Sequence, residues 1–252
     1  HLHSWFPLYA QGFDLCLVSL RDHCPWFVGK NMSKERVLWF PPFAQDSLTP
    51  PAEPVEKKWD CIFVGRVNDT TPMRKKFLDS LKERLPDLHV VFGNYGILFP
   101  EARVVLNFCE HGDLNFRVFE ALGMGSALVT PVIANGQDLL FKDEEHFLLY
   151  DSEHVEDAFA KIQRLLADDC LRMRLEQQGC ALVNERHRAR HRAASFTQEI
   201  AKLWPVHETI IQTRRAKAAM IRREFLRFLY LLWAQEYQDP QIKESYLRAS
   251  RG

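Results

Sequence analysis

The 252-residue sequence lacks several features that would assign it to a class at once. None of its six cysteines forms a C-x-x-C pair, which argues against a zinc or disulfide framework and favours reduced thiols in the cytoplasm. The 33 basic and 33 acidic side chains cancel, which argues against a nucleic-acid partner held by bulk phosphate attraction. No run of about 18 apolar residues is present, so no segment is expected to span a membrane. The opening residues also lack the basic and then apolar pattern of a signal peptide.

Short apolar runs alternate along the chain with helical patterns. The runs are continuous rather than alternating, which is typical of strands that are buried on both faces. Seven runs are expected to be strands: Leu15–Ser19, Val37–Phe40, Cys61–Val64, Leu88–Phe92, Val104–Phe108, Ala127–Thr130 and Phe147–Tyr150.

Helical patterns lie between several of these runs. Apolar residues fall on one face of residues 74–85, of the stretch after Asp113, and of residues 155–166. The resulting β-α-β-α alternation predicts the α/β class, with a Rossmann-like parallel sheet and helices on both of its faces. A carboxyl-terminal helical extension is expected to follow this sheet.

A proline-rich segment divides the chain. Five prolines fall within the fourteen residues from Pro41 to Pro54, which excludes a helix or a central strand and predicts a linker or an extended crossing. The piece before it is too short to bury a core alone, and it opens at His1 without an initiator Met. We therefore expect upstream sequence to be absent. The predicted domains are a remnant and linker over 1–50, a Rossmann-like domain over 51–204, and the extension over 205–252.

The strongest local signal lies in residues 107–125. A buried strand is expected to end near Phe108, a turn with Gly112 follows, and a helix is expected to begin with Asp113 as its N-cap. A helix N-terminus beyond the carboxyl end of a parallel strand presents free N–H groups, which favours an anion there. Glu120, about two turns into the helix, either accepts hydrogen bonds from a ribose diol or is solvated, and the residues leave both readings open.

The stretch from Gly112 to Leu122, GDLNFRVFEAL, closely resembles the signature of the CgeB-type glycosyltransferases, which belong to the GT-B, group 1 superfamily. The similarity covers roughly residues 14–204, more weakly outside this stretch. It extends over Phe63–Arg66, which looks like the family's first strand and phosphate loop, and over Gly123–Thr130, Gly136–Leu140, Asp143–Phe147 and His187–Arg192.

This resemblance implies that the chain is mainly the second domain of a GT-B fold, with residues 51–204 binding a nucleotide sugar. By the same resemblance Glu120 would bind the ribose hydroxyls. Arg66 and Arg74 would be the catalytic cations, because the leaving nucleotide diphosphate gains charge as the glycosidic bond breaks. The planar fork of arginine suits phosphate oxygens. For Arg74, a solvated cation at a helix start is an equally open reading.

Further donor contacts follow from the same motif. The predicted donor-binding residues, besides Glu120, are Gly65, Asn94, Tyr95, Gly112, Asp113, Leu114, Asn115 and Arg117. Tyr95 lies in a Gly-Asn-Tyr-Gly loop, where it either stacks on the base or belongs to a simple turn. The sequence has no D-x-D pair, and we expect neither a metal nor another cofactor.

Two departures from the superfamily pattern bear on catalysis. Members often carry two glutamates eight residues apart, but the position eight before Glu120 is Gly112, and Glu110 lies ten before it. The amino-terminal domain that would supply acceptor contacts is almost absent. The acceptor, whether glycan, protein or lipid, therefore stays open.

Residues 210–237 form one long helical candidate without Gly or Pro. Six cations stand there against one Glu over residues 214–227, whereas residues 135–169 hold ten acidic and three basic side chains. The helix either packs back across the domains, lies on an anionic membrane surface, or pairs with another helix. The expected location is thus the cytoplasm, with peripheral membrane contact through 210–237 as one alternative.

These observations predict a glycosyltransferase that moves a sugar from a nucleotide diphosphate sugar to an acceptor hydroxyl. Resemblance to the superfamily implies retention at the anomeric carbon without a metal. Two alternatives stay open: a non-catalytic nucleotide-binding or scaffold module of the same ancestry, and a nucleotide-sugar epimerase of the same fold.

Overall fold

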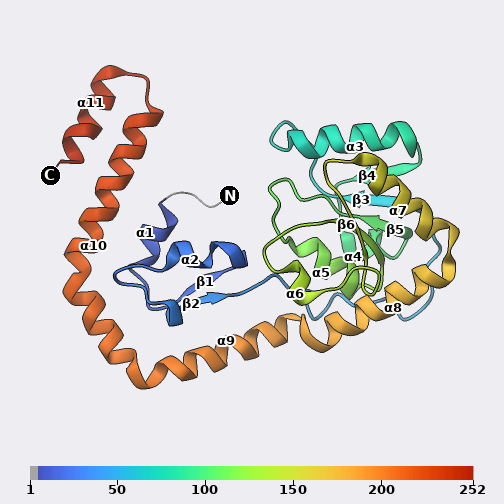
Figure 1. Cartoon of the computed structure of the whole chain (residues 1–252), viewed down its shortest axis with the longest axis horizontal. Coiled ribbons are helices and arrows are strands. Elements are labelled where there is room, and N and C mark those ends of the chain that lie inside the picture. Colours follow the sequence, from blue (N-terminus) through green and yellow to red (C-terminus); the bar gives the residue numbers. More distant parts are fainter. Residues whose placement is uncertain (1–4, 252) are drawn as a thin grey trace. The chain divides into compact units, whose positions relative to one another are not determined.

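The computed structural model describes residues 5–251 (Figure 1). The chain divides into two compact units, which are described separately below. One unit runs from Pro41 to Phe196, and the other takes in the chain up to Phe40 and from Thr197 onward. These limits differ from the predicted boundaries at 50/51 and 204/205. Residues 1–4 of the predicted segment 1–50, and residue 252 of the predicted extension, lie outside the described residues.

The first of these units, residues 41–196, contains a five-stranded sheet in which all neighbouring strands are parallel, with the order β4-β3-β5-β6-β7. Each strand coincides with a predicted apolar run, which confirms the expected α/β class and its parallel sheet. The strands are β3 (Trp59–Val64), β4 (Leu88–Val91), β5 (Ala102–Leu106), β6 (Ala127–Pro131) and β7 (Leu148–Tyr150).

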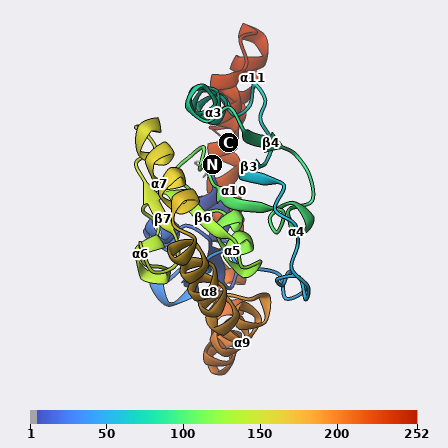
Figure 2. The same ribbon diagram turned by 90° about the vertical axis from the view of Figure 1, so that its right-hand side faces the viewer.

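Helices cover both faces of this sheet (Figures 1 and 2). Successive strand residues point to opposite faces, so Cys61 and Phe63 pack against α3 and α7, whereas Ile62 and Val64 belong to the core on the side of α5 and α8. The helices are α3 (Pro72–Arg84), α4 (Tyr95–Leu98), α5 (Phe116–Gly123), α6 (Gln137–Leu140), α7 (Val155–Ala167), α8 (Asp169–Arg186) and α9 (Ala189–Leu203), the last of which extends past the unit's end at Phe196.

Two buried arginines tie the proline-rich segment to this unit. Arg188 is fully buried and donates hydrogen bonds to the carbonyls of residues 45 and 48 and of Gly123. Arg192 donates to the carbonyls of residues 41 and 42, at 3.0 and 3.1 Å. Residues 41–58 form neither helix nor strand, as predicted. The two arginines explain why residues 41–50 belong with the five-stranded sheet and not with the residues before them.

The other unit contains a short parallel sheet and a long helical hairpin. Phe225 of the long helix contacts the rings of Trp5 and Tyr9 at 6.2 and 5.3 Å between ring centres, and these contacts join the carboxyl-terminal extension to the amino-terminal piece. The elements are α1 (Phe6–Ala10), β1 (Cys16–Val18), α2 (Cys24–Phe27), β2 (Val37–Trp39), α10 (His207–Glu236) and α11 (Pro240–Ala249), with 3-10 turns at Arg21–His23, Lys34–Arg36 and Trp204–Val206.

Among the helices of residues 5–251, none combines the length and the apolar composition that crossing a bilayer would require.

Candidate functional site

The strand order creates one crevice where a ligand is expected. From β3 the chain passes to β4 on one side and then returns to β5 on the other side of β3. In parallel α/β sheets, ligands bind outside the carboxyl ends of the strands at such a reversal. The residues that follow these two strands are Gly65 and Arg66 after β3, and Asn107 and Phe108 after β5.

Three arginines gather at this crevice. Arg66 follows β3, Arg74 lies in the first turn of α3, and Arg117 lies in the first turn of α5. Arg74 Nη1 donates to the Arg66 carbonyl at 2.9 Å. The guanidinium groups of Arg74 and Arg117 lie 5.7 and 5.3 Å from the centre of the Phe63 ring, so this ring at the end of β3 supports both.

The charge of this arginine cluster (Arg66, Arg74 and Arg117) is not neutralised by ion pairs. None of the three lies within ion-pair distance of a carboxylate in the described part of the chain. Burial lowers the pKa of Arg117, and the neighbouring Arg74 cation lowers it further. The like charges of Arg74 and Arg117 repel each other in this half-buried place, so an anion bound between them would be stabilised by both. The guanidinium group of Arg66 is exposed and lies 5.8 Å from the centre of the Phe92 ring.

Glu110 fixes the helix that carries Arg74. Its two carboxylate oxygens accept hydrogen bonds from the backbone N–H groups of Met73 and Arg74, at 3.0 and 2.9 Å. A carboxylate at a helix N-terminus satisfies free donors and the helix dipole. Glu110 is buried, and this contact commits it to holding α3 in place. It therefore does not replace the missing first glutamate of the superfamily pattern.

Asn107 organises the turn beside the arginine cluster. Its Oδ1 accepts hydrogen bonds from Asn115 Nδ2 at 3.1 Å and from Arg117 Nη1 at 3.4 Å, and its Nδ2 donates to Thr130 Oγ1 at 3.0 Å. Asn107 is fully buried. Gly65 lies close by, and a Cβ at this position would be 2.9 Å from Arg117 Nη2. Glycine therefore leaves the space that the Arg117 side chain occupies.

Glu120 is buried on the first turns of α5, next to Tyr95. The Tyr95 hydroxyl lies within hydrogen-bonding reach of the Glu120 carboxylate. Burial raises the pKa of Glu120, and it also raises the pKa of Tyr95. The hydrogen bond from Tyr95 and the Arg117 charge act in the opposite direction on Glu120. Tyr95 thus partners the carboxylate in this structure, and Asn94 caps the short helix α4 by accepting from Gly96 N at 2.9 Å.

The turn before α5 differs from its predicted form. Asp113 is not the N-cap: the helix begins at Phe116, and Asn115 occupies the N-cap position. The Asn115 side chain donates to Asn107 and forms no capping hydrogen bond, and within residues 5–251 its Oδ1 is buried without a partner. Leu114, which lies between Asp113 and the observed N-cap, is buried in the core. The first N–H groups of α5 have no side-chain cap.

Gly112 sits at the exposed tip of this turn. Its φ of +65° falls in the left-handed region, which glycine adopts without strain. Its carbonyl accepts a hydrogen bond from Asn135 Nδ2 at 3.3 Å. Gly112 also lines a pocket of about 860 Å³ between α3, the turns at 108–112 and 131–134, and residues 152–155.

Seven of the eleven predicted site residues fall into two groups; the other four are Asn94, which caps α4, and Asp113, Leu114 and Asn115 in the turn before α5. The crevice gathers Gly65, Arg66, Arg74, Arg117 and Glu120, with Tyr95 beside them. The pocket takes in Gly112 but not Arg66, Tyr95 or Glu120. Sequence reasoning missed the roles of Asn107 and Glu110. Two sequence signals could have found them. Asn107 is an amide at the end of a buried strand, and Glu110 is an acid two residues before a turn glycine.

Comparisons with known proteins bear on the family and the fold. Residues 74–198, just under half of the chain, match a family model described as glycosyl transferase-like. The matched region contains most of the crevice residues and begins at Arg74. Among curated proteins, no significant match to the sequence was found.

Solved structures with the same fold are glycosyltransferases or related synthases. Sucrose-phosphate synthase from Thermosynechococcus elongatus is similar at a TM-score of 0.62 with 14% identity, over 79% of this chain and 61% of that chain. Anabaena Alr3699/HepE, in complex with UDP and glucose, is similar at a TM-score of 0.62 with 12% identity, over 79% and 67%. The pneumococcal O-GlcNAc transferase GtfA, in complex with UDP and GlcNAc, is similar at a TM-score of 0.56 with 13% identity, over 82% of this chain and 47% of that chain.

At these identities the likeness shows the fold, which is that of GT-B glycosyltransferases. The chain spans about 61% of the sucrose-phosphate synthase structure and about 47% of the GtfA structure. The family model and these structures thus show a likeness to glycosyltransferases over part of the chain.

Proposed function

We propose that this chain holds the donor-binding domain of a GT-B glycosyltransferase, which moves a sugar from a nucleotide diphosphate sugar to an acceptor hydroxyl. The observation that carries this proposal is the arginine cluster at the strand-order reversal, with a buried carboxylate on the neighbouring helix. A cationic centre and a ribose-binding carboxylate in one crevice match the two polar parts of a nucleoside diphosphate. The CgeB-type subfamily rests on the resemblance of residues 112–122.

In the proposed reaction the arginine cluster holds the diphosphate. As the bond between the anomeric carbon and the diphosphate oxygen breaks, negative charge accumulates on the departing diphosphate. Arg74 and Arg117 are already oriented by Phe63, and Arg74 is fixed by the Arg66 carbonyl, so little reorganisation is needed when this charge develops. The uncapped N–H groups of α5 add donors on the same side.

Glu120 is proposed to hold the ribose. An ionised carboxylate accepts two hydrogen bonds, which matches a 2′,3′-diol. Tyr95 lies beside this carboxylate and lowers its pKa, and a bound ribose would share or replace that interaction. Asn94 and Tyr95, at the start of α4, are proposed to pack against the base.

Retention at the anomeric carbon and independence from a metal are carried forward from the resemblance. The arginine cluster supports the second of these proposals, because guanidinium groups supply positive charge at the place where the diphosphate would lie. Retention has its support in the superfamily pattern alone.

One observation favours a second candidate function. Gly112 stands where the superfamily has its first glutamate, and Glu110 is committed to the N-terminus of α3. A module that binds a nucleotide sugar without turning it over would keep the crevice and lose that acid. Transfer or hydrolysis well above background, measured across a panel of UDP- and GDP-sugars, excludes this candidate.

Titration calorimetry with UDP tests the donor site directly. Glu120→Gln keeps the size of the side chain and should weaken UDP binding about tenfold, because one charged acceptor of the ribose is lost. Glu176→Gln is the matched control, since Glu176 on α8 is also a partly buried carboxyl whose pKa is raised by burial. Wild-type protein that does not bind any nucleoside diphosphate would overturn the proposal, as would a Glu120→Gln variant with unchanged affinity.

A further inference from the structure

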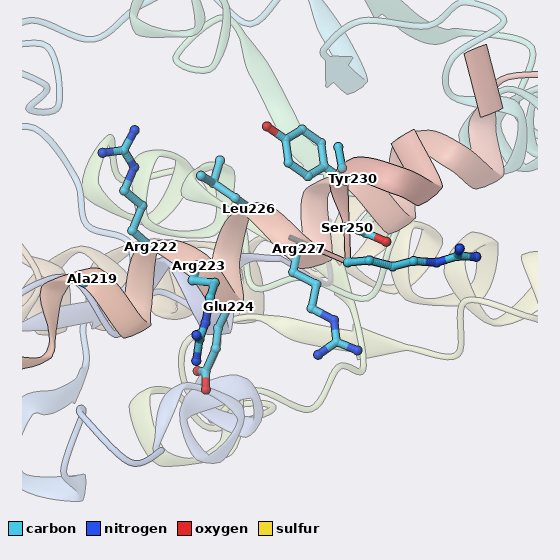
Figure 3. A pocket seen from close by; sticks show the side chains of 10 residues that line it. Ala219, Arg222, Arg223, Glu224, Leu226, Arg227, Tyr230 and Ser250 are labelled. Carbon is cyan, nitrogen blue, oxygen red and sulfur yellow. The ribbon is translucent and has the colours of Figure 1, made fainter. Parts of the chain in front are cut away.

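The carboxyl-terminal hairpin contains a pocket of about 800 Å³ that the donor site does not use. It lies between residues 219–230 of α10 and the end of α11 (Figure 3). The hairpin is held together by Tyr246 of α11, whose ring lies 6.2 Å from Tyr230 and 5.4 Å from Trp233 between centres. The pocket is therefore part of the folded hairpin.

Arginine dominates the lining of this pocket. Arg222, Arg223 and Arg227 of α10 contribute to it together with Arg251, and Glu224 is the single acid among the lining residues. All of these side chains are exposed. Over residues 5–251, Arg222, Arg223 and Arg227 form no ion pair, so their positive charge faces solvent without a partner.

The opposite face of α10 is already used for folding. Ile221 is buried there, Phe225 packs on the rings of α1, and Arg214 pairs with Asp14 at 2.9 Å. Arg214 on that face has an acidic partner within the same unit. Arg222 borders both faces, and among residues 5–251 Arg223 and Arg227 of the pocket face form no ion pair. Packing within the unit accounts for one side of the helix and leaves the arginine-rich side to an outside partner.

Apolar and aromatic side chains accompany the arginines. Leu226 and Tyr230 line the pocket between them. One turn further along, Trp233 and Tyr237 remain 37% and 46% exposed. Trp and Tyr are enriched where a bilayer meets water, because the ring enters the headgroup region while its polar atom stays hydrated. Arginine beside such rings is attracted to anionic headgroups.

The arginines are spread and do not converge on one point. In Figure 3 the side chains of Arg223 and Arg227 extend to one side of α10, and that of Arg222 extends to the other. Arg223 and Arg227 thus share one side of the helix, where a surface that carries many phosphates could contact both at once. We propose that the pocket face of the α10–α11 hairpin docks on an anionic phospholipid membrane, with lipid phosphates at Arg223 and Arg227.

Vesicle flotation with the full chain tests this docking. The protein should bind mixed vesicles of phosphatidylcholine and phosphatidylglycerol and should not bind phosphatidylcholine alone. The double variant Arg223→Gln/Arg227→Gln should reduce partitioning roughly 30-fold at low salt, because each basic residue near such a surface contributes about 1 kcal/mol. The double variant Arg223→Lys/Arg227→Lys should retain binding. Salt should weaken the wild-type interaction.

A matched control removes the same charge elsewhere. Lys75 and Lys82 are exposed on α3, and Lys75→Gln/Lys82→Gln should leave vesicle binding unchanged. The proposal is overturned if the control variant loses as much binding as the arginine variant, if phosphatidylcholine vesicles bind equally well, or if anionic vesicles do not bind at all. The arginine variant should bind UDP as the wild type does, so failure here leaves the donor site untouched.

Two further measurements identify the source of the phosphate. Lipids brominated in their acyl chains should quench tryptophan fluorescence, and Trp233→Phe should lose most of that quenching. Inorganic pyrophosphate or RNA, added at the same phosphate concentration as the vesicles, should bind much more weakly than the vesicles do. The membrane is overturned as the partner if pyrophosphate or RNA binds as strongly as the vesicles do and if Arg223→Gln/Arg227→Gln abolishes that binding.

Discussion

Two groups of arginines in the same unit lie in opposite environments. Arg188 and Arg192 are buried, and their donors are taken up by backbone carbonyls of the proline-rich segment and of Gly123. The arginine cluster of the crevice lacks carboxylate partners, and two of its members stand over one phenylalanine ring. A satisfied guanidinium is a structural element, whereas an unsatisfied group of like charges is a place for a ligand.

The sharpest test of this comparison is Arg188→Ala. The substitution leaves the carbonyls of Gly123 and of residues 45 and 48 buried without their donor, and it opens a cavity. We expect the free energy of unfolding to fall by about 3 kcal/mol or more, measured by urea denaturation. Arg190→Ala, which removes an exposed pair with Asp46, should cost less than about 1 kcal/mol. Equal losses in the two variants would contradict the assignment of Arg188 as a structural residue.

Acid should lower the free energy of unfolding through His187, which lies beside the buried Arg192. Burial, and then the Arg192 cation, lower the pKa of His187 from 6.5 to about 4. Its Nδ1 accepts a hydrogen bond from Arg192 Nη2 at 3.1 Å, which requires the neutral ring. As the pH falls, His187 of the unfolded chain takes up a proton before His187 of the folded chain does. The contribution of the neutral ring to the free energy of unfolding is therefore full above pH 6.5 and is lost as the pH falls towards about 4.

This loss amounts to roughly 3 kcal/mol across that interval. It is measured as the difference in the pH dependence of the unfolding free energy between wild type and His187→Gln, which keeps a neutral acceptor. A His187→Gln variant with the same acid sensitivity as the wild type would assign the effect to other groups.

Substitution in the arginine cluster of the crevice should affect ligand binding rather than the stability of the fold. Arg74→Gln removes one of three like charges, so the unfolding free energy should change little or rise. UDP affinity should fall about 10- to 100-fold, the value of one lost charge-assisted contact. Calorimetry and urea denaturation of the same variant measure both. Lys82→Gln, at the far end of α3, should alter neither quantity. Large destabilisation without loss of UDP affinity would place Arg74 among the structural arginines.

Much of the fold could be predicted from the sequence because buried parallel strands read as continuous apolar runs. All seven expected strands exist, and helices occupy residues 74–84, 155–166 and 210–236 of the three expected stretches. The expectation that Arg66, Arg74 and Glu120 belong to one site comes from the resemblance of residues 63–66 and 112–122 to the glycosyltransferase pattern, and it stays a prediction. Parallel strands bring the positions that follow them to one edge of the sheet.

The errors came from contacts between residues far apart in the sequence. Asp113 has the chemistry of an N-cap, but the helix begins at Phe116. Leu114 is buried in the core, and the Asn115 side chain donates a hydrogen bond to Asn107. The contact between Glu110 and the N-terminus of α3 joins positions 36 and 37 residues apart, which no local pattern reveals. Local chemistry names candidate residues, and tertiary packing decides which partner each one finds.

The smallest expected effect is that of Glu120, the proposed ribose-binding residue, on the stability of the fold. Burial raises its pKa, so the folded state retains a proton that the unfolded chain has released. Its contribution to stability is therefore present below the ordinary glutamate pKa of 4.5 and is lost as pH rises through the raised value. Glu120→Gln, which cannot ionise, should be slightly more stable than wild type at neutral pH and equal to it in acid. Thermal unfolding across pH measures this difference. A variant that unfolds at a lower temperature at neutral pH would show that the carboxylate stabilises the fold, and Glu120 would then resemble Arg188 more than Arg74.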